Sequence, residues 1–382
     1  MPIWLCPKCK RSWNIDPTKK VHCVCGERYL PDMPTFPKRL WNFSYAMYKH
    51  WMEGMPTCTD ADVQGRLDVC KECNLFTGSH CAHQSCGCNI NGEVKFLNKL
   101  AWADQQCPVG KWTVVKPKWM TTAQLTDDVS LLSQILSPEI SAIVGISRSG
   151  VMVGAQLASY LHLPLYSLDI FTGELVKCGS GYRLQDHQES DGPYLLVDDT
   201  VNSYYTLTAA KKAVAHSYET AVVYVPPNHE DKVDYFVRQL ALPHYLEWHF
   251  FNSHYNEDAS YDMDGVICED FDLDTLDNDV KYIAALQTRP PKYLPRNKAI
   301  SIITGRHECY RNATMYWLKQ HKVEVKTLIM AHESLKYDQV AEFKAKCITS
   351  KIYVESCVHQ AMRIKELRPE ITVICPTEGV VL

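Results

Sequence analysis

The chain has 382 residues, of which 46% are hydrophobic and 22% charged, and its formal net charge is -4. These are the values of a folded globular protein, and the length predicts two to three domains. No apolar run reaches the roughly 18 residues that a membrane-spanning helix needs. The first ten residues also lack the pattern of a signal peptide, so we expect a cytoplasmic protein with no membrane contact.

Cysteine and charge are both distributed unevenly along the chain. Eleven of the 17 cysteines precede residue 108, and closely spaced cysteines in a chain without a secretory signal indicate metal sites more often than disulfides. Residues 1–120 hold 16 Lys and Arg against 10 Asp and Glu, whereas the remainder holds 24 against 34. Because each zinc ion bound by four thiolates adds about -2 to the formal charge, this basic excess does not by itself indicate nucleic-acid binding.

Residues 1–30 predict a small zinc ribbon. Cys6 and Cys9 form one closely spaced pair, and Cys23 and Cys25 form another. Two such turns can each present two sulfur atoms to one tetrahedral Zn²⁺. The metal would replace the hydrophobic core that so short a segment cannot build; the alternative is a set of buried thiols without metal.

Residues 31–115 predict a second cysteine-rich zinc module. A Pro-rich link and an aromatic segment precede a CxxC pair, a CxC pair and a closing Cys-Pro-Val-Gly-Lys-Trp sequence. This order resembles small zinc-binding modules of phage and bacterial proteins that end in CPxGKW. The preferred ligands are Cys70, Cys73, Cys88 and Cys107, and the further candidates are Cys81, His83 and Cys86. The surplus of candidates leaves open a second ion or an iron–sulfur cluster.

We expect the zinc to be structural, because complete ligand sets leave no coordination position for water. Docking of a macromolecule is the second role to consider. Tryptophans with interleaved Lys and Arg can stack on the bases of nucleic acid, although packing within a small domain is their commoner role. The tryptophans concerned are Trp41, Trp51, Trp102, Trp112 and Trp119.

Residues 120–250 alternate strand-like and helix-like runs, which predicts a parallel sheet flanked by helices. One buried strand ends in a loop between Gly145 and Gly150, and a helix follows. Backbone N–H groups at the start of such a helix, with Arg148 beside them, can hold a diphosphate. About fifty residues later, a second buried strand ends on Asp198 and Asp199.

In this order the two motifs resemble those of the type I phosphoribosyltransferases. The resemblance implies Mg²⁺-dependent transfer from phosphoribosyl diphosphate (PRPP), in which the protein positions the donor and screens its charge. It implies that Asp198 and Asp199 face the ribose hydroxyls and that a mobile loop lies between Phe171 and Gly192. The implied phosphate-binding residues are Ser147, Arg148, Ser149 and Gly150 for the diphosphate, and Thr200, Val201, Asn202, Ser203, Tyr204, Tyr205 and Thr206 for the 5′-phosphate.

Tyr204 departs from the family pattern, which usually has glycine in the 5′-phosphate loop. A tyrosine tolerates a positive φ poorly. The sequence therefore predicts either a reshaped loop or a domain that binds a nucleotide without turnover.

The Asp262-Met-Asp264-Gly265 sequence and the Thr304-Gly305-Arg306 sequence about forty residues later resemble the first two motifs of the haloacid dehalogenase-like phosphatases. This resemblance implies that Asp262 attacks phosphorus to form an aspartyl phosphate and that Asp264 serves as general acid and base. Thr304 would bind the transferring phosphoryl group, with Gly305 and Arg306 beside it.

The remaining motifs of that family require a lysine and a further acid. Lys344 fits the lysine position best, with Lys336 and Lys346 as rivals. Glu355 would join Asp262 and Asp264 in holding Mg²⁺. Ser356 stands where the family more often has a second acid, which implies modest magnesium affinity. Only 39 residues separate Asp264 from Thr304, so no sizeable cap domain is expected.

The fold class expected is α/β, with two doubly wound parallel-sheet domains at 120–250 and 251–382 behind the zinc modules. The expected function is phosphoribosyl transfer from PRPP to a base or hydroxyl acceptor, including a base in nucleic acid, followed by removal of the 5′-phosphate. The alternatives are nucleotide salvage with nucleotidase activity, and a PRPP- or nucleotide-sensing regulator whose zinc modules bind nucleic acid. The expected partners are PRPP and a phosphorylated nucleoside or sugar, and the module types indicate a phage source.

Overall fold

The computed structural model describes residues 3–15, 21–29, 32–52, 55–90, 98–178, 191–201, 204–227, 229–270, 279–296 and 299–382. The chain divides into two compact units. Unit 1 comprises Met1–Lys116 and Thr126–Pro243, and unit 2 comprises Pro117–Leu125 and His244–Leu382. Within the described ranges, no helix combines the length and the apolar character needed to cross a bilayer.

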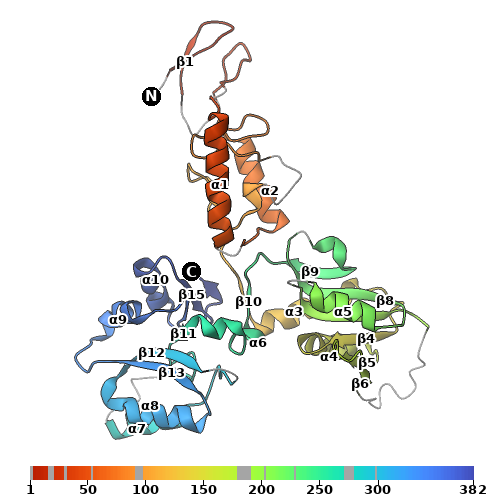
Figure 1. Cartoon of the computed structure of the whole chain (residues 1–382), viewed down its shortest axis with the longest axis vertical. Coiled ribbons are helices and arrows are strands. Elements are labelled where there is room, and N and C mark those ends of the chain that lie inside the picture. Colours follow the sequence, from red (N-terminus) through yellow and green to blue (C-terminus); the bar gives the residue numbers. More distant parts are fainter. Residues whose placement is uncertain are drawn as a thin grey trace. The chain divides into compact units, whose positions relative to one another are not determined.

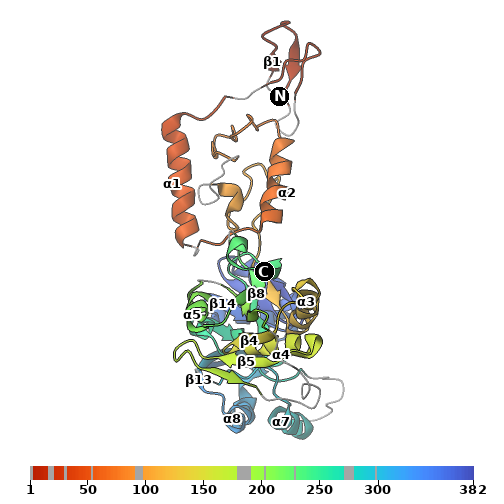
Figure 2. The same cartoon turned by 90° about the vertical axis from the view of Figure 1, so that its right-hand side faces the viewer.

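The cysteine-rich part of unit 1 contains little regular structure. Its elements are the antiparallel strands β1 (Ile3–Leu5) and β2 (Ser12–Asn14), helices α1 (Phe36–Met52) and α2 (Asp60–Lys71), and the short 3-10 helix η2 (Lys99–Ala101). Figure 2 shows α1 and α2 on either side of irregular segments. A small apolar core forms where Ala46 of α1 meets Ala101 and Trp102, and the His50 ring stacks on Trp102 at 4.5 Å.

The buried side chain of Arg66 organises the irregular segments beside α2. Its guanidinium lies over the ring of Trp112, 4.4 Å from the centroid. The two terminal nitrogens donate four hydrogen bonds of 2.7 to 3.1 Å to backbone carbonyls, namely those of Leu100, Trp102, Gln105 and Thr113. These charge-assisted hydrogen bonds compensate for the small apolar core, because they join the irregular backbone around η2 and Thr113 to α2.

The larger part of unit 1 is built on a six-stranded sheet with the order β6-β5-β4-β7-β8-β9. All neighbouring pairs are parallel except β5 and β6. The strands are β4 (Ala142–Ile146), β5 (Leu165–Leu168), β6 (Leu175–Lys177), β7 (Tyr194–Thr200), β8 (Tyr218–Val225) and β9 (Tyr235–Gln239), and the helices are α3 (Thr122–Ile135), α4 (Ser149–Leu161) and α5 (Tyr205–Ala213).

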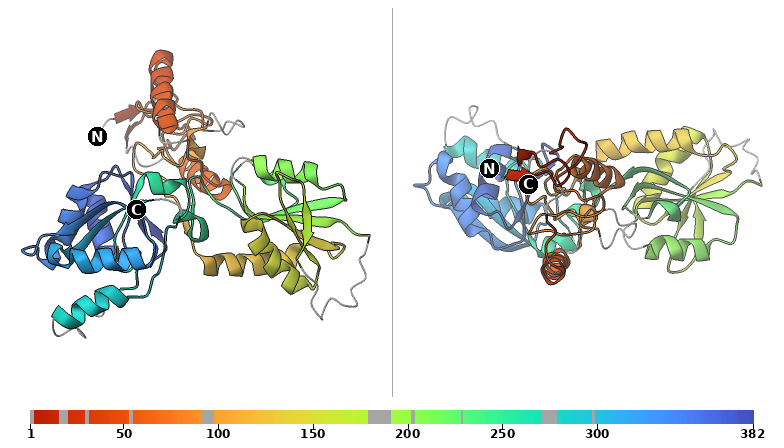
Figure 3. Two further views of the ribbon diagram at one scale, coloured as in Figure 1. Left: turned by 60° about the horizontal axis from the view of Figure 1, so that its bottom comes forward. Right: turned by 90° about the horizontal axis from the view of Figure 1, so that it is seen from above.

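Helices cover both faces of this sheet. Successive side chains of a strand point to opposite faces. Val144 packs with Leu207 and Ala210 of α5, whereas its neighbour Ile143 lies against Gly154 of α4. The left view of Figure 3 shows the strands between these helices. From β4 the chain first adds β5 and β6 on one side of the sheet and then returns to add β7, β8 and β9 on the other side. The strand order therefore reverses between β4 and β7. Ligands of open α/β sheets usually bind at the carboxyl ends of the strands at such a point.

Unit 2 has a second six-stranded sheet, with the order β13-β12-β11-β14-β15-β16 and only β16 antiparallel to its neighbour. The strands are β11 (Ala259–Tyr261), β12 (Ile300–His307), β13 (Val325–Ala331), β14 (Ile352–Val354), β15 (Thr372–Cys375) and β16 (Val380–Val381). A separate parallel pair joins β3 (Trp119–Met120) to β10 (Tyr245–Leu246). The helices are α6 (Glu247–Phe250), α7 (Asp279–Thr288), α8 (Arg311–Gln320), α9 (Val340–Cys347) and α10 (Val358–Leu367).

The two faces of this second sheet also carry separate cores. Ile302 packs in one cluster with Trp317 of α8, and the adjacent Ile303 packs in another with Ala345 of α9 and Ile364 of α10. Figure 1 shows the strands between α8 and the α9–α10 pair. Here the strand order reverses at β11, which lies between β12 and β14.

Arg66→Met should destabilise the cysteine-rich part by about 3 kcal/mol or more, because the substitution removes four hydrogen bonds to backbone carbonyls, two of them buried. Urea unfolding followed by tryptophan fluorescence measures the loss. Arg363→Met is the matched control, since Arg363 is half exposed and forms only surface ion pairs. Equal stability of the two variants would contradict the role assigned to Arg66.

Candidate functional site

Four cysteines of the first module form a compact cluster of sulfur atoms. The Sγ atoms of Cys6, Cys9, Cys23 and Cys25 all lie within 4.8 Å of one another, with Cys6 and Cys25 3.5 Å apart and Cys9 and Cys23 3.1 Å apart. A tetrahedral zinc with bonds of about 2.3 Å requires sulfur separations of about 3.8 Å. The cluster therefore fits a structural zinc ion, as the spacing predicts.

The cysteines of the second module do not form a cluster of that kind. Among the residues that the structure describes, the four thiols above are the one group of three or more potential ligands whose atoms all lie within 4.8 Å. The candidates Cys70, Cys73, Cys86, Cys88 and Cys107 come from separate segments, at the end of α2, in the following turns and after η2. Cys70 accepts a hydrogen bond from Trp112 Nε1 at 3.3 Å. The ligand set of this module stays a prediction.

In unit 1, two adjacent carboxylates are buried at the carboxyl end of β7. Asp198 is 8% exposed and Asp199 is 1% exposed. Asp198 Oδ1 accepts hydrogen bonds from Ser149 Oγ at 3.3 Å and from the Asp199 backbone N–H at 2.9 Å, and Asp199 Oδ1 accepts from the Thr200 N–H at 2.9 Å. Burial, together with the charge of Asp199, raises the pKa of Asp198 well above its usual range. Such a pair favours a cationic or hydroxyl-bearing ligand beside it.

The loop expected to bind diphosphate lies next to this acid pair. Gly145 of β4 is in register with Val197 of β7, so the loop that follows β4 lies beside Asp198. A Cβ atom at Gly150 would collide with the Val197 carbonyl oxygen, which means that only glycine lets α4 begin so close to β7. Ser147 and Arg148 are exposed in this loop, and the peptide bond between them is cis.

The loop expected to bind the 5′-phosphate is described in part. Val201 is buried, Thr200 and Thr206 are half-buried, and Tyr205 is exposed. Asn202 and Ser203 lie outside the described residues, as does most of the predicted mobile loop, at 179–190.

Tyr204 adopts the left-handed backbone conformation, with φ at 61°. From the sequence, a tyrosine was expected to tolerate a positive φ poorly. Two tertiary contacts of its side chain explain how Tyr204 is held in this conformation. The hydroxyl of Tyr204 donates a hydrogen bond of 2.7 Å to the His229 carbonyl, and Lys232 Nζ lies over the ring, 4.7 Å from its centroid. Both partners follow β8, about 25 residues away, and no sequence signal identified them.

In unit 2, three side chains converge on Lys344 of α9. Its ammonium donates hydrogen bonds to Asp262 Oδ2 at 2.7 Å, Glu355 Oε2 at 2.7 Å and Gln360 Oε1 at 2.9 Å. Asp262 follows β11 and Glu355 follows the adjacent β14. Although burial alone would lower it, these carboxylates raise the pKa of Lys344. The structure thus places Lys344 at the acids, whereas the rivals Lys336 and Lys346 are exposed.

Asp264 is held by Arg306 from the end of β12. Arg306 donates from Nε to Oδ2 at 2.9 Å and from Nη2 to Oδ1 at 2.5 Å, and its Nη1 donates to Thr314 Oγ1 at 3.1 Å. The arginine was expected to contact substrate, but here its buried guanidinium binds the carboxylate. Thr304 is buried two residues before Arg306, and its hydroxyl oxygen accepts a hydrogen bond from the Arg306 N–H at 3.3 Å.

The turn after Asp264 is closed by Gly265 and Ser356. Gly265 has φ at 73°, and an added Cβ would meet the Ser356 side chain. Ser356 Oγ donates a hydrogen bond of 3.0 Å to the Asp264 carbonyl. Ser356 therefore fixes the turn that carries Asp264.

The acids of this site provide the oxygen ligands that Mg²⁺ prefers. Asp262 and Glu355 share the charge of Lys344, and Asp264 is paired with Arg306. With all three acids ionised, the three carboxylates and two cations would leave one net negative charge, but burial raises the pKa of Asp262 to about 8 despite the nearby Lys344. Among the described residues, however, these carboxylates do not form a ligand cluster as compact as the four thiols, and their oxygens already accept hydrogen bonds from Lys344, Arg306 and backbone N–H groups. Binding of magnesium here therefore requires these contacts to rearrange.

No protein-family model and no curated protein sequence matches the chain. Among solved structures, the purine phosphoribosyltransferase of Pyrococcus horikoshii Ot3 is 20% identical, with 34% of this chain and 92% of that one covered at a TM-score of 0.26. The xanthine-guanine-hypoxanthine phosphoribosyltransferase of Helicobacter pylori is 18% identical; the match covers 34% of this chain and 90% of that chain, with a TM-score of 0.26. The orotate phosphoribosyltransferase of Aeropyrum pernix is 14% identical; the match covers 31% of this chain and 71% of that chain, with a TM-score of 0.25.

Cys23→Ser should lower the zinc content of the purified protein by about one equivalent, because three thiolates and a hydroxyl hold zinc far more weakly than four thiolates. Metal analysis and the visible absorption of the cobalt-substituted protein measure this loss. Cys178→Ser is the control, since Cys178 is exposed and lies far along the chain. Unchanged zinc content in Cys23→Ser would refute the site.

Proposed function

We propose that this chain combines two activities: transfer of a phosphoribosyl group from PRPP in unit 1, and hydrolysis of a phosphomonoester in unit 2. One observation carries the proposal. Each sheet has buried carboxylates where its strand order reverses, at the carboxyl ends of β7 and β11. Phosphate-binding elements lie next to them: the start of α4 in unit 1 and Lys344 in unit 2.

In the transferase reaction, the bond from C1 of ribose to diphosphate breaks through an oxocarbenium-like state, and the acceptor forms the new bond to C1. Asp198 and Asp199 would bind the ribose hydroxyls, and their negative charge would stabilise the cationic sugar. The loop of Ser147, Arg148 and Ser149 would hold the leaving diphosphate. Mg²⁺, when bound, screens the charge of that diphosphate.

In the phosphatase reaction, a carboxylate oxygen of Asp262 would form a bond to phosphorus while the bond to the ester oxygen breaks. Asp264 would give a proton to the leaving oxygen and later take one from the attacking water. Lys344 holds Asp262 in place and screens the approach of the anionic substrate. Asp262, Asp264 and Glu355 would hold Mg²⁺, which supplies further screening of the phosphoryl oxygens.

Arg306 gives this second site a specific requirement. In the structure both carboxylate oxygens of Asp264 accept hydrogen bonds from the Arg306 guanidinium, whereas the role of general acid requires this carboxyl group to face the leaving oxygen of the substrate. Transfer of Arg306 from Asp264 to the substrate phosphate would free the carboxyl group for this role, because the incoming anion competes for the same cation.

Two alternatives keep the same sites. One is salvage of a free base with the phosphatase acting on a nucleotide, and the other is a domain that senses PRPP or a nucleotide without turnover. Tyr204 favours the sensing alternative, because it replaces the usual glycine of the 5′-phosphate loop and its side chain fixes that loop to the chain after β8.

Asp198→Asn and Asp199→Asn should each lower diphosphate release from PRPP by roughly 100-fold or more, because a neutral amide stabilises the cationic sugar poorly. The assay uses labelled PRPP, Mg²⁺ and a panel of bases and oligonucleotides. Asp127→Asn, an exposed change on α3, should behave as wild type. Binding of PRPP by the wild-type protein with no diphosphate release would support the sensor and contradict transfer.

Asp262→Asn should abolish phosphate release from phosphomonoesters while diphosphate release continues, because an amide cannot form the acyl phosphate. Lys344→Met should lower the rate by roughly 100-fold or more, through loss of charge screening, whereas the exposed Lys346→Met should not. Malachite green detection of phosphate measures the effect. Loss of both activities in Asp262→Asn, with the fold intact by circular dichroism, would argue against two separate sites.

A further inference from the structure

Helix α1 is unusual in having apolar residues on both sides. One side packs inward, where Phe43, Ala46 and Met47 meet Trp102. A helix at the surface of a globular protein usually presents a polar face to solvent. The other side of α1 instead exposes large aromatic side chains: Trp41, Tyr45, Tyr48 and Trp51, each between 54% and 72% exposed. Spacings of three and four residues bring their rings to one side of the helix.

The charge of α1 is entirely of one sign. Its 17 residues include Lys38, Arg39 and Lys49 and no acidic residue. Lys49 Nζ lies 5.3 Å from the centroid of the Tyr45 ring. Exposed aromatics interleaved with cations are the two features of surfaces that bind single-stranded nucleic acid.

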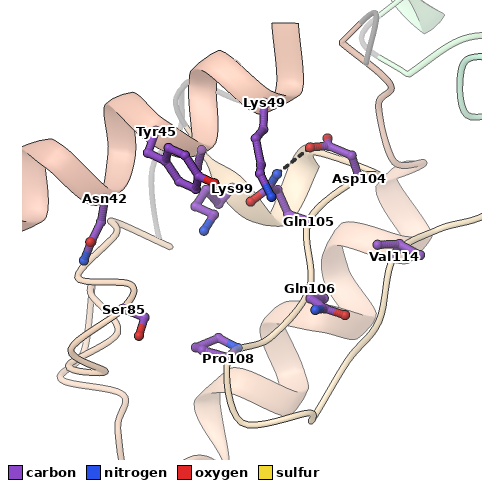
Figure 4. A pocket seen from close by; sticks show the side chains of 11 residues that line it. Asn42, Tyr45, Lys49, Ser85, Lys99, Asp104, Gln105, Gln106, Pro108 and Val114 are labelled. Carbon is purple, nitrogen blue, oxygen red and sulfur yellow. Dashed lines mark hydrogen bonds between the residues drawn. The ribbon is translucent and has the colours of Figure 1, made fainter. Parts of the chain in front are cut away.

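A cavity of about 480 Å³ adjoins this face of α1. Figure 4 shows Tyr45 and Lys49 reaching the cavity from α1, with Lys99 of η2 close to Tyr45. Four of the other eight lining side chains are neutral hydrogen-bonding groups: Asn42, Ser85, Gln105 and Gln106. Asp104 also lines the cavity, but its carboxylate is bound by His50 Nδ1 at 2.5 Å and by Gln105.

We propose that α1 and this cavity form a binding surface for a single-stranded polynucleotide. Bases would stack on the rings of Trp41, Tyr45 and Tyr48, and phosphates would lie near Lys49 and Lys99. The amide nitrogens of Asn42 and Gln105 already donate to protein oxygens, which leaves the amide oxygens of these two side chains to accept from base edges and the Gln106 amide to do both. The cavity volume is within the range of small-ligand sites. Charge complementarity selects this occupant, since a second copy of α1 would bring cation against cation.

The surface is independent of the two proposed reactions. It contains none of the carboxylates assigned to them, and its binding requires neither PRPP nor Mg²⁺. Failure of this inference therefore leaves the proposed function untouched, and the reverse also holds.

Fluorescence anisotropy of the full chain with a labelled single-stranded oligonucleotide of mixed sequence, as DNA and as RNA, tests the inference. Tyr45→Ala should weaken binding by roughly 5- to 100-fold, the loss expected for one base stack. Lys49→Gln combined with Lys99→Gln should reduce the slope of log affinity against log salt by about 1.4, because each phosphate contact on a single strand contributes about 0.7.

Tyr337→Ala and Lys351→Gln are the matched controls, because both side chains are well exposed and lie in unit 2. They should bind as wild type, and all variants should keep the wild-type circular dichroism and zinc content. Absence of binding to either oligonucleotide would overturn the inference. So would wild-type affinity in the α1 variants, binding to anionic lipid vesicles in place of oligonucleotides, or self-association that Tyr45→Ala abolishes.

Discussion

A carboxylate removed from water is stable only when hydrogen bonds or an opposite charge replace its hydration, and this constraint shapes both sheets. In unit 1 the compensation comes from backbone N–H groups and Ser149, which requires α4 to begin against β7 and therefore requires glycine at position 150. In unit 2 it comes from Lys344 and Arg306, which are delivered by α9 and by the end of β12. The positions of α4, α9 and the end of β12 thus follow from the need to compensate these buried acids. Buried acids do not by themselves stabilise a fold, so stability alone does not explain their presence.

The two sites solve the same problem with different consequences for chemistry. The Asp198–Asp199 pair is compensated by neutral donors, and in the proposed function its negative charge would stabilise a cationic sugar at the transition state. Around Asp262, Lys344 and Arg306 offset the charge of the acids, which in the proposed function would favour attack on an anionic phosphate. Under the proposed function, the chain would make a phosphorylated product at one site and remove its phosphate at the other, and the proposed polynucleotide surface on α1 would bring a macromolecule to the same polypeptide.

Sequence predicted those features that depend on residue type and short spacing. The four thiols of the first module do come together, and the acids at 198–199 and 262–264 do lie at strand ends. It could not predict contacts that depend on the tertiary path of the chain. The anchoring of Tyr204 by His229, the capture of Asp264 by Arg306, the contact of Gln360 with Lys344 and the carbonyl cluster around Arg66 all join segments whose separation in sequence carries no signal.

The proposed function requires that phosphoribosyl transfer from PRPP and hydrolysis of a phosphomonoester occur in one chain, at separate carboxylate sites. A ³¹P NMR time course with the wild-type protein, PRPP, Mg²⁺ and an acceptor tests this most directly, because diphosphate, phosphoribosyl product and inorganic phosphate give distinct signals. The account predicts that diphosphate and the phosphoribosyl product appear first and that inorganic phosphate grows as the product declines. Inorganic phosphate that appears without diphosphate, or a spectrum that does not change, would contradict it.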